Sequence, residues 1–273
     1  MRVALLQFRA SLDKAENLTT IRHHAQATAW AKPDVVVCPE ASMYDFGKPD
    51  LPLAAAAEPL DGPFVQALGK LAGDLGATMI AGMFETCEHD SARAYNTVVA
   101  VSPDGSLAGA YRKIHLYDAF GYRESDRLVS GGNERVVIRV GDHRLGLLTC
   151  YDLRFPEFAR ALADDGADVL VVPAAWMSGP LKEDHWATLL RARAIENTCY
   201  VAGSAQCPPG YSGRSMLIDP MGIVVASLGE EPGSCLGAVD PERVAAVRQR
   251  NPTLAHRRFD VVDRNTADGD TVQ

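Results

Sequence analysis

The chain has 273 residues, of which 47% are hydrophobic and 23% are charged, and its formal net charge is −8. This is the composition of an ordinary globular protein, and the length allows one or two domains. No cluster of Lys or Arg exceeds two adjacent residues, and the net charge is acidic. The sequence therefore argues against nucleic acid and anionic membranes as partners.

The cellular compartment is predicted from the N-terminus and the cysteines. The apolar run in MRVALLQFRA is too short for the core of a signal peptide, and no later segment approaches a membrane span. The cysteines are sparse and show no CxxC spacing; they are Cys38, Cys87, Cys150, Cys199, Cys207 and Cys235. We therefore expect free thiols, not disulfides, in a cytoplasmic protein.

Short β-branched runs alternate with helical patterns along the whole chain. In the first half we predict strands at 3–8, 34–40, 78–85, 95–103 and 106–116, and helices at 14–31 and 62–76. In the second half we predict strands at 136–140, 144–150, 168–176, 199–206, 214–222 and 223–228, and helices at 155–166 and 184–198. Such an alternation predicts an α/β protein in which helices cover mixed sheets.

The two halves of the chain contain one pair of similar segments. DVVVCPEA (34–41) and DVLVVPAA (168–175) agree at five of eight positions, and each leads through a helix into a strand with an Ala-Gly pair. We interpret this as two similar halves, each supplying one sheet; the alternative is a chance likeness of two buried strands. Because no low-complexity linker separates the halves, we predict one domain over 1–260 and a polar C-terminal tail over 261–273.

The two similar segments differ at Glu40, whose place in the second half is taken by Ala174. A carboxylate at the end of a buried strand is costly unless it is paired or solvated. In α/β sheets, ligands usually bind at the carboxyl ends of the strands. Glu40 is therefore a candidate site residue, although a glutamate that caps a helix or forms a salt bridge would fit the position as well.

Cys150 lies in LLTCYDLRFPE, where a predicted strand ends shortly before a helix begins. A thiol near a helix N-terminus is favoured as the thiolate. A sharp turn from strand to helix also exposes a nucleophile, and the backbone N–H of Tyr151 would then point toward the group under attack. The alternative is a buried, inert cysteine. Lys113, at the end of another strand, would by itself be an ordinary surface lysine.

Taken together, these three residues change the interpretation. The stretches VVVCPEAS around Glu40, YRKIHLYD around Lys113 and LLTCYDLRFPE around Cys150 resemble the Glu-Lys-Cys motifs of the nitrilase superfamily, the carbon–nitrogen hydrolases, in the same order. RARAIENTCYV, GRSMLIDPMG and the terminal RRF match as well, so the resemblance covers essentially 1–260. It implies a four-layered α-β-β-α sandwich of two mixed sheets and assembly into a homodimer or a larger homo-oligomer.

The resemblance also implies a mechanism. Cys150 would attack an amide, Glu40 would act as acid and base, and the Lys113 ammonium and the Tyr151 backbone N–H would hold the oxyanion. Glu124, in GYRESDRLVSGG, matches a second glutamate near the family's active site; alternatively, it forms a loop salt bridge with Arg123 or Arg127.

The expected substrate is a small amide that carries a carboxylate, hydrolysed through a thioester to the acid and ammonia. The chain most resembles the branch of ω-amidase and deaminated-glutathione amidase; an N-carbamoyl amidase or a nitrilase is the alternative. Two loops, 42–50 and 174–180, should line the pocket with Tyr44, Phe46, Trp176 and Met177. We expect Arg154 or Arg123 to meet the carboxylate, although ordinary packing or local pairing would also account for these side chains.

Other kinds of site find less support. No HExxH, GxGxxG or GxxxxGK[ST] motif occurs, so we predict neither a metal nor a nucleotide cofactor. A papain-like pair would need a histidine beside Cys150, and His115, His143 and His185 lie in no recognisable protease context. A non-catalytic scaffold or thiol redox sensor would be expected to lack Glu40, Lys113 or Cys150, and all of them are present.

Overall fold

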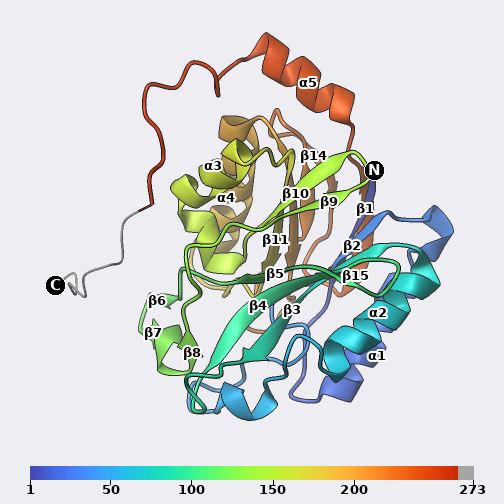
Figure 1. The fold of residues 1–273 in the computed structure, drawn as a ribbon, viewed down its shortest axis with the longest axis vertical. Helices are drawn as coiled ribbons and strands as arrows, with labels where there is room; N and C mark the ends of the chain where they lie inside the picture. Colours follow the sequence, from blue (N-terminus) through green and yellow to red (C-terminus); the bar gives the residue numbers. More distant parts are fainter. Residues whose placement is uncertain (264–273) are drawn as a thin grey trace.

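Two β-sheets lie face to face in the computed structural model, which describes residues 1–263 (Figure 1). Within these residues the first sheet has the strand order β15-β1-β2-β3-β4-β5, with β8 beside β4. Its strands are β1 (Arg2–Gln7), β2 (Val35–Val37), β3 (Thr78–Thr86), β4 (Ala94–Val101), β5 (Leu107–Arg112), β8 (Leu128–Val129) and β15 (Gly233–Ala238). β1, β2 and β3 run parallel to one another.

The second sheet has the order β14-β13-β12-β11-β10-β9. Its strands are β9 (Val137–Val140), β10 (His143–Leu147), β11 (Val169–Ala174), β12 (Tyr200–Ala205), β13 (Met216–Ile218) and β14 (Val224–Ser227). Here β10, β11 and β12 are the parallel strands. A separate small hairpin joins β6 (Asp118–Ala119) and β7 (Tyr122–Arg123).

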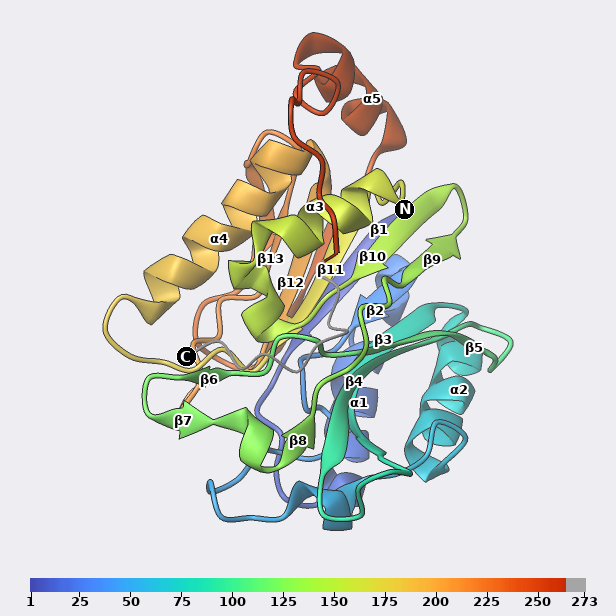
Figure 2. The ribbon, with the colours of Figure 1, turned by 60° about the vertical axis from the view of Figure 1, so that its left-hand side comes forward.

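Helices cover the outer face of each sheet. α1 (Lys14–Gln26) and α2 (Pro63–Leu75) pack on the first sheet, and α3 (Pro156–Asp164) and α4 (Lys182–Asn197) pack on the second (Figure 2). The predicted four-layered α-β-β-α sandwich is therefore confirmed. α5 (Pro241–Arg250) lies beyond one end of the sandwich (Figure 1).

The side-chain pattern of β1 shows how the layers form. Val3 and Leu5 join the apolar cluster that also contains the strands of the second sheet. Ala4 and Leu6, which point the other way, join the cluster that contains residues of α1 and α2. Because both faces are buried, the strand is a continuous apolar run without polar alternation.

Several predicted boundaries need correction. The helix expected over 14–31 ends at Gln26 and is followed by a separate 3-10 turn, and the strand expected over 34–40 pairs only at Val35–Val37. β15 and α5 were not predicted. β15 pairs antiparallel with β1, so the second half of the chain adds a strand to the first sheet, and the assignment of one sheet to each half was wrong.

Two further expectations concern membrane spans and the C-terminal tail. No helix within residues 1–263 is both long and apolar enough to cross a membrane. Most of the predicted tail over 261–273 lies outside the described part, and the single domain over 1–260 stays a prediction.

Candidate active site

A cavity of about 710 Å³ opens at the carboxyl ends of parallel strands from both sheets. Glu40 follows β2, Cys150 follows β10 and Ala175 follows β11, and all three line it. Lys113, Glu124 and Tyr151 line the same cavity. The structure thus brings together every residue for which we expected a catalytic role, in a space of the size that small-molecule sites have.

The Glu40 carboxylate is held by donors from both sheets. Its Oε1 accepts hydrogen bonds from Lys113 Nζ (3.0 Å) and Asn96 Nδ2 (2.8 Å), and its Oε2 accepts one from the backbone N–H of Ala175 (2.7 Å). Gly82 of β3 passes so close that a Cβ there would lie 2.5 Å from the backbone nitrogen of Ala41. A glycine is therefore required at this position for the turn that carries Glu40.

Lys113 follows the last residue of β5 and is 1% exposed. Its backbone N–H donates to the Asn96 carbonyl (2.8 Å), and its own carbonyl accepts from the Gly131 N–H (2.9 Å). Its ammonium lies 3.0 Å from Glu40 Oε1 and 2.8 Å from Glu124 Oε2. Burial alone would lower the pKa of Lys113, but the charges of Glu124 and Glu40 outweigh burial and raise that pKa well above its ordinary value. The ammonium is thus kept protonated.

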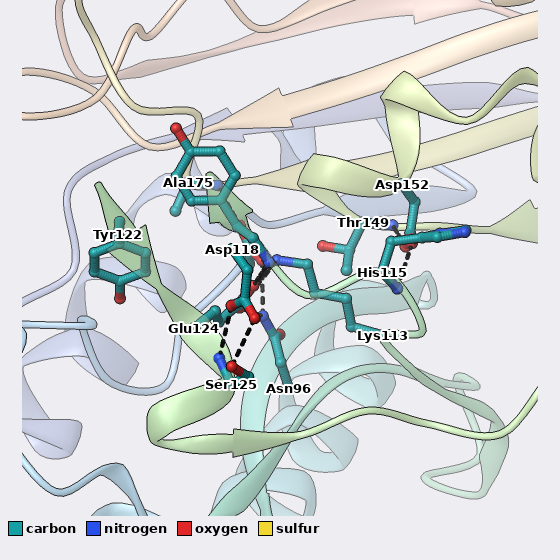
Figure 3. A network of polar contacts seen from close by, with 12 residues as sticks. Asn96, Lys113, His115, Asp118, Tyr122, Glu124, Ser125, Thr149, Asp152 and Ala175 are labelled. Atoms are coloured by element: carbon teal, nitrogen blue, oxygen red, sulfur yellow. Dashed lines mark hydrogen bonds and ion pairs between the residues drawn. The ribbon is translucent and has the colours of Figure 1, made fainter. Parts of the chain in front are cut away.

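The Glu124 side chain is buried and lines the cavity, so it does not lie on the surface of its loop. It begins a short 3-10 turn after the β6–β7 hairpin, and its carboxylate accepts from Lys113, from Asn96 Nδ2 (3.1 Å) and from the Tyr117 N–H (2.6 Å) (Figure 3). Arg123 pairs instead with Asp126. Arg127 donates to the backbone carbonyls of Phe46, Lys48 and Leu51. The alternative of a loop salt bridge is therefore wrong.

Cys150 has a left-handed backbone, with φ of 48°, and begins a 3-10 helix over Cys150–Arg154. The α-helix starts only at Pro156. Burial, followed by the negative charge of Glu40, raises the pKa of the Cys150 thiol well above its ordinary value, although Lys113 opposes the shift. This direction runs against the expectation that a helix N-terminus favours the thiolate, and the α-helix itself begins only at Pro156. A base beside Cys150 would then have to remove the thiol proton.

Sequence reasoning missed Asn96, which donates to both Glu40 and Glu124. The available signal was an asparagine in the otherwise apolar strand β4. Tyr117, Lys182 and Tyr211 also line the cavity and were not predicted. Their positions depend on loops that come together only in the folded chain.

The expected pocket residues divide into two groups. Phe46, Trp176, Met177 and Arg154 line the cavity, as expected. Tyr44 does not line it, so that expectation was wrong, and of the two arginines offered for the carboxylate only Arg154 lines the cavity.

Backbone bonding explains the position of Tyr44. The Asp45 N–H donates to the Ser11 carbonyl (3.0 Å), and the Asp45 carboxylate accepts from the Tyr211 hydroxyl (3.2 Å) across the cavity. Asp45 thus takes the cavity side of the loop, and Tyr44 packs against the apolar cluster under the first sheet. Arg123 is largely exposed beside Asp126.

The region of the chain that the structure describes contains no group of His, Cys, Asp or Glu side chains able to hold a metal ion. In the cavity, the Lys113 ammonium is instead paired with the carboxylates of Glu40 and Glu124. Such an arrangement is suited to proton transfer and to stabilising a developing negative charge.

The family model for carbon–nitrogen hydrolases matches residues 2–249. The chain belongs to the carbon–nitrogen hydrolase family. Membership makes this protein a hydrolase of carbon–nitrogen bonds, and the non-catalytic alternatives are set aside.

Individual relatives support the assignment. The hydrolase is 40% identical to "Hydrolase Rv0480c" of Mycobacterium tuberculosis, over 94% of this chain and 95% of that one. It is 35% identical to the mouse deaminated glutathione amidase, over 95% and 84% of the two chains. Among solved structures, Nit3 of Saccharomyces cerevisiae, a member of branch 10 of the nitrilase superfamily, superposes with a TM-score of 0.84 at 28% identity over 95% and 97%.

Proposed function

We propose that this hydrolase cleaves the amide bond of a small carboxylate-bearing molecule, through a thioester on Cys150, to give an acid and ammonia. The observation that carries the proposal is the convergence of Glu40, Lys113 and Cys150 in one buried cavity, with the ammonium ion-paired to two carboxylates. Each feature matches a requirement of acyl transfer: a nucleophile, a base and a fixed positive charge.

In the first half of the reaction, Glu40 takes the proton of the Cys150 thiol and the sulfur attacks the amide carbonyl carbon. The negative charge that develops on the carbonyl oxygen is stabilised by the Lys113 ammonium and the Tyr151 backbone N–H. Removing one such donor typically lowers the rate about 100- to 1,000-fold. Glu40 then gives its proton to the leaving nitrogen, the C–N bond breaks, and ammonia departs.

In the second half, Glu40 removes a proton from water, which attacks the thioester carbonyl at the same oxyanion site. The C–S bond breaks, and Glu40 returns the proton to the sulfur of Cys150. One carboxylate thus acts as base and acid in each half. Glu124 helps to keep Lys113 charged, and in this proposal it would also position the substrate's amide nitrogen.

A carboxylate on the substrate is supported by two of the cations that line the cavity, Arg154 and Lys182. Within residues 1–263 neither forms a salt bridge with a carboxylate. Lys182 Nζ donates to the Tyr117 hydroxyl (3.0 Å), and Arg154 Nε is buried without a hydrogen-bond partner. Burial, and then the charge of Arg154, lowers the pKa of Lys182. Arg154 and Lys182 repel each other on one side of the cavity, and an anion between them would stabilise both charges. The carboxylate of the substrate would be that anion.

The test is a comparison of matched substrates. We would measure kcat/KM for an ω-amide that ends in a carboxylate, for its neutral isostere, and for the corresponding carbamoyl compound and nitrile. The carboxylate amide should be preferred, and Lys182→Gln should raise its KM at least about tenfold, as expected for a lost charge pair. The exposed Lys70→Gln serves as the matched control.

Two outcomes would count against the proposal. Equal kcat/KM for the charged and neutral amides would remove the carboxylate from the substrate. A clear preference for the nitrile or the carbamoyl compound would move the reaction to another branch of the family.

Assembly is also proposed. Ile195 of α4 is 45% exposed, and the neighbouring turn after β13 exposes Met221 and Ile223. Such an apolar surface supports a homodimer or a larger homo-oligomer that packs through α3 and α4. The cytoplasmic location and the absence of nucleic-acid and membrane partners remain predictions from the sequence.

A further inference from the structure

Asp152 is a fully buried carboxylate that takes no part in the reaction steps above. It is 0% exposed and is not among the residues that line the cavity. Its Oδ2 accepts from the Tyr111 hydroxyl (2.7 Å) and the Thr149 N–H (2.9 Å). Its Oδ1 bonds to His115 Nδ1 (2.7 Å) and accepts from the His115 N–H (3.3 Å) (Figure 3). A charge buried this deeply is stable only because several donors hold it.

These donors come from the two segments that carry the proposed oxyanion site. Tyr111 and His115 stand two residues before and two residues after Lys113, and Thr149 directly precedes Cys150. Aromatic contacts join the same two segments. The His115 ring stacks on Phe155 with centroids 3.7 Å apart, and the Tyr111 ring stacks on Phe158 at 5.4 Å.

The link matters because Lys113 and Cys150 belong to different sheets. Lys113 follows β5 of the first sheet, and Cys150 follows β10 of the second. An oxyanion site works only when its donors are held close to the position of the developing charge, and a misplacement of about 1 Å can lower the rate about 100-fold. The left-handed φ of Cys150 is also unfavourable for a residue with a side chain and must be enforced by its surroundings.

We propose that Asp152 is a positioning residue, which fixes the distance between the Lys113 ammonium and the Cys150–Tyr151 turn by holding both segments. The inference rests on the proposed acyl transfer at Cys150. Asp152 acts through geometry, because its carboxylate contacts neither the cavity nor the reacting groups. Burial, and then the charge of Asp152, raises the pKa of Tyr111 well above its ordinary value, so the hydroxyl remains a donor.

The test compares two reactions of the same sulfur. Amide turnover needs the oxyanion donors, whereas alkylation of Cys150 by iodoacetamide forms no oxyanion. In Asp152→Asn, kcat should fall about 10- to 100-fold. KM and the rate of Cys150 alkylation should each stay within about threefold of the wild-type value. This change is far smaller than the loss of kcat that misplaced oxyanion donors cause.

Asp219→Asn is the matched control, because Asp219 is a buried carboxylate that also holds a turn, through Met221, Ile223 and Arg243, with no contact to Lys113 or Cys150. Its kcat should be unchanged. A purely structural role for Asp152 would lower the melting temperature of both variants and leave kcat of the folded protein alone.

Three outcomes decide the inference. An unchanged kcat in Asp152→Asn overturns it, and so does an equal loss of turnover and alkylation. If Asp152→Asn does not fold, Tyr111→Phe removes a single donor while keeping the ring, and a normal kcat there overturns the inference. Failure of the proposed function looks different, because Cys150→Ala would then keep the wild-type amide turnover.

Discussion

Glu124→Gln removes one charge from the buried group formed by Lys113, Glu40 and Glu124 and keeps the size of the side chain. Each carboxylate oxygen of Glu124 accepts from two donors. Oε1 accepts from Lys113 Nζ (3.0 Å) and Asn96 Nδ2 (3.1 Å), and Oε2 accepts from Lys113 Nζ (2.8 Å) and the Tyr117 N–H (2.6 Å). A glutamine has only one accepting oxygen. In either orientation, two donor contacts therefore lose their acceptor.

The size of the effect follows from this count. Lys113 Nζ and Asn96 Nδ2 each keep Glu40 Oε1 as an acceptor, so only the Tyr117 N–H can be left without one. A buried donor left without an acceptor costs about 1–3 kcal/mol, shared between folding and catalysis. A loss of about 2.7 kcal/mol in transition-state stabilisation corresponds to a hundredfold fall in kcat/KM. We expect a fall of about that size. Little of the cost then remains for folding, so the melting temperature should fall by no more than about 4 °C.

The assay is steady-state hydrolysis of the preferred amide, with thermal unfolding followed in parallel. Asp126→Asn is the control, since Asp126 lies two residues further along the same turn but is largely exposed, and its carboxylate pairs with Arg123 (3.4 Å). Its kcat/KM should match that of the wild type. A near-normal kcat/KM in Glu124→Gln would show that Glu124 has no part in catalysis.

Three other predictions concern backbone packing, pH and assembly. Gly82→Ala places a Cβ 2.5 Å from the backbone nitrogen of Ala41, so it should displace Glu40 and lower kcat at least about tenfold, and a crystal structure with Glu40 unmoved would contradict this. Burial and the charge of Arg154 lower the pKa of Lys182. As pH rises, its ammonium therefore loses its proton at a lower pH than an ordinary lysine does. KM for the carboxylate amide should then rise with pH while KM for the neutral amide stays flat; parallel curves would refute the role of Lys182. Sedimentation at micromolar concentration should show a dimer or larger, and a monomer alone would exclude the proposed assembly.

The central strands of the sandwich could be predicted because strands such as β2, β11 and β12 are buried on both faces and read as continuous apolar runs. The four layers themselves were implied by the family resemblance. β15 could not be predicted, since GSCLGA lacks β-branched residues and is only half-buried. Its strand conformation depends on pairing with β1, more than 200 residues away in sequence. α5 has a polar composition and likewise gives a weak apolar pattern, although Asp240 and Pro241 do mark its beginning.

The residues of the site likewise fall into those that the sequence pointed to and those that it did not. Glu40 and Cys150 stood out because each ends an apolar strand, and Lys113 was singled out only by the resemblance to the carbon–nitrogen hydrolases. Asn96 and Asp152, in contrast, act through hydrogen bonds to distant segments that no local pattern reveals. The choice between Tyr44 and Asp45 as the cavity residue depends on one backbone bond in a loop without periodicity. The thiol form of Cys150 depends on burial and on Glu40, which together outweigh the charge of Lys113.

The most direct test of the proposed mechanism is peptide mass spectrometry of the hydrolase quenched during turnover of its amide substrate. An acyl group should be found on Cys150, with a mass equal to that of the substrate less ammonia, and it should be absent from Cys150→Ala. Cys199 and Cys207 should stay unmodified, because both are buried and, unlike Cys150, neither lines the cavity. An acyl group on Cys199 or Cys207, or turnover by Cys150→Ala, would contradict the assignment of Cys150 as the nucleophile.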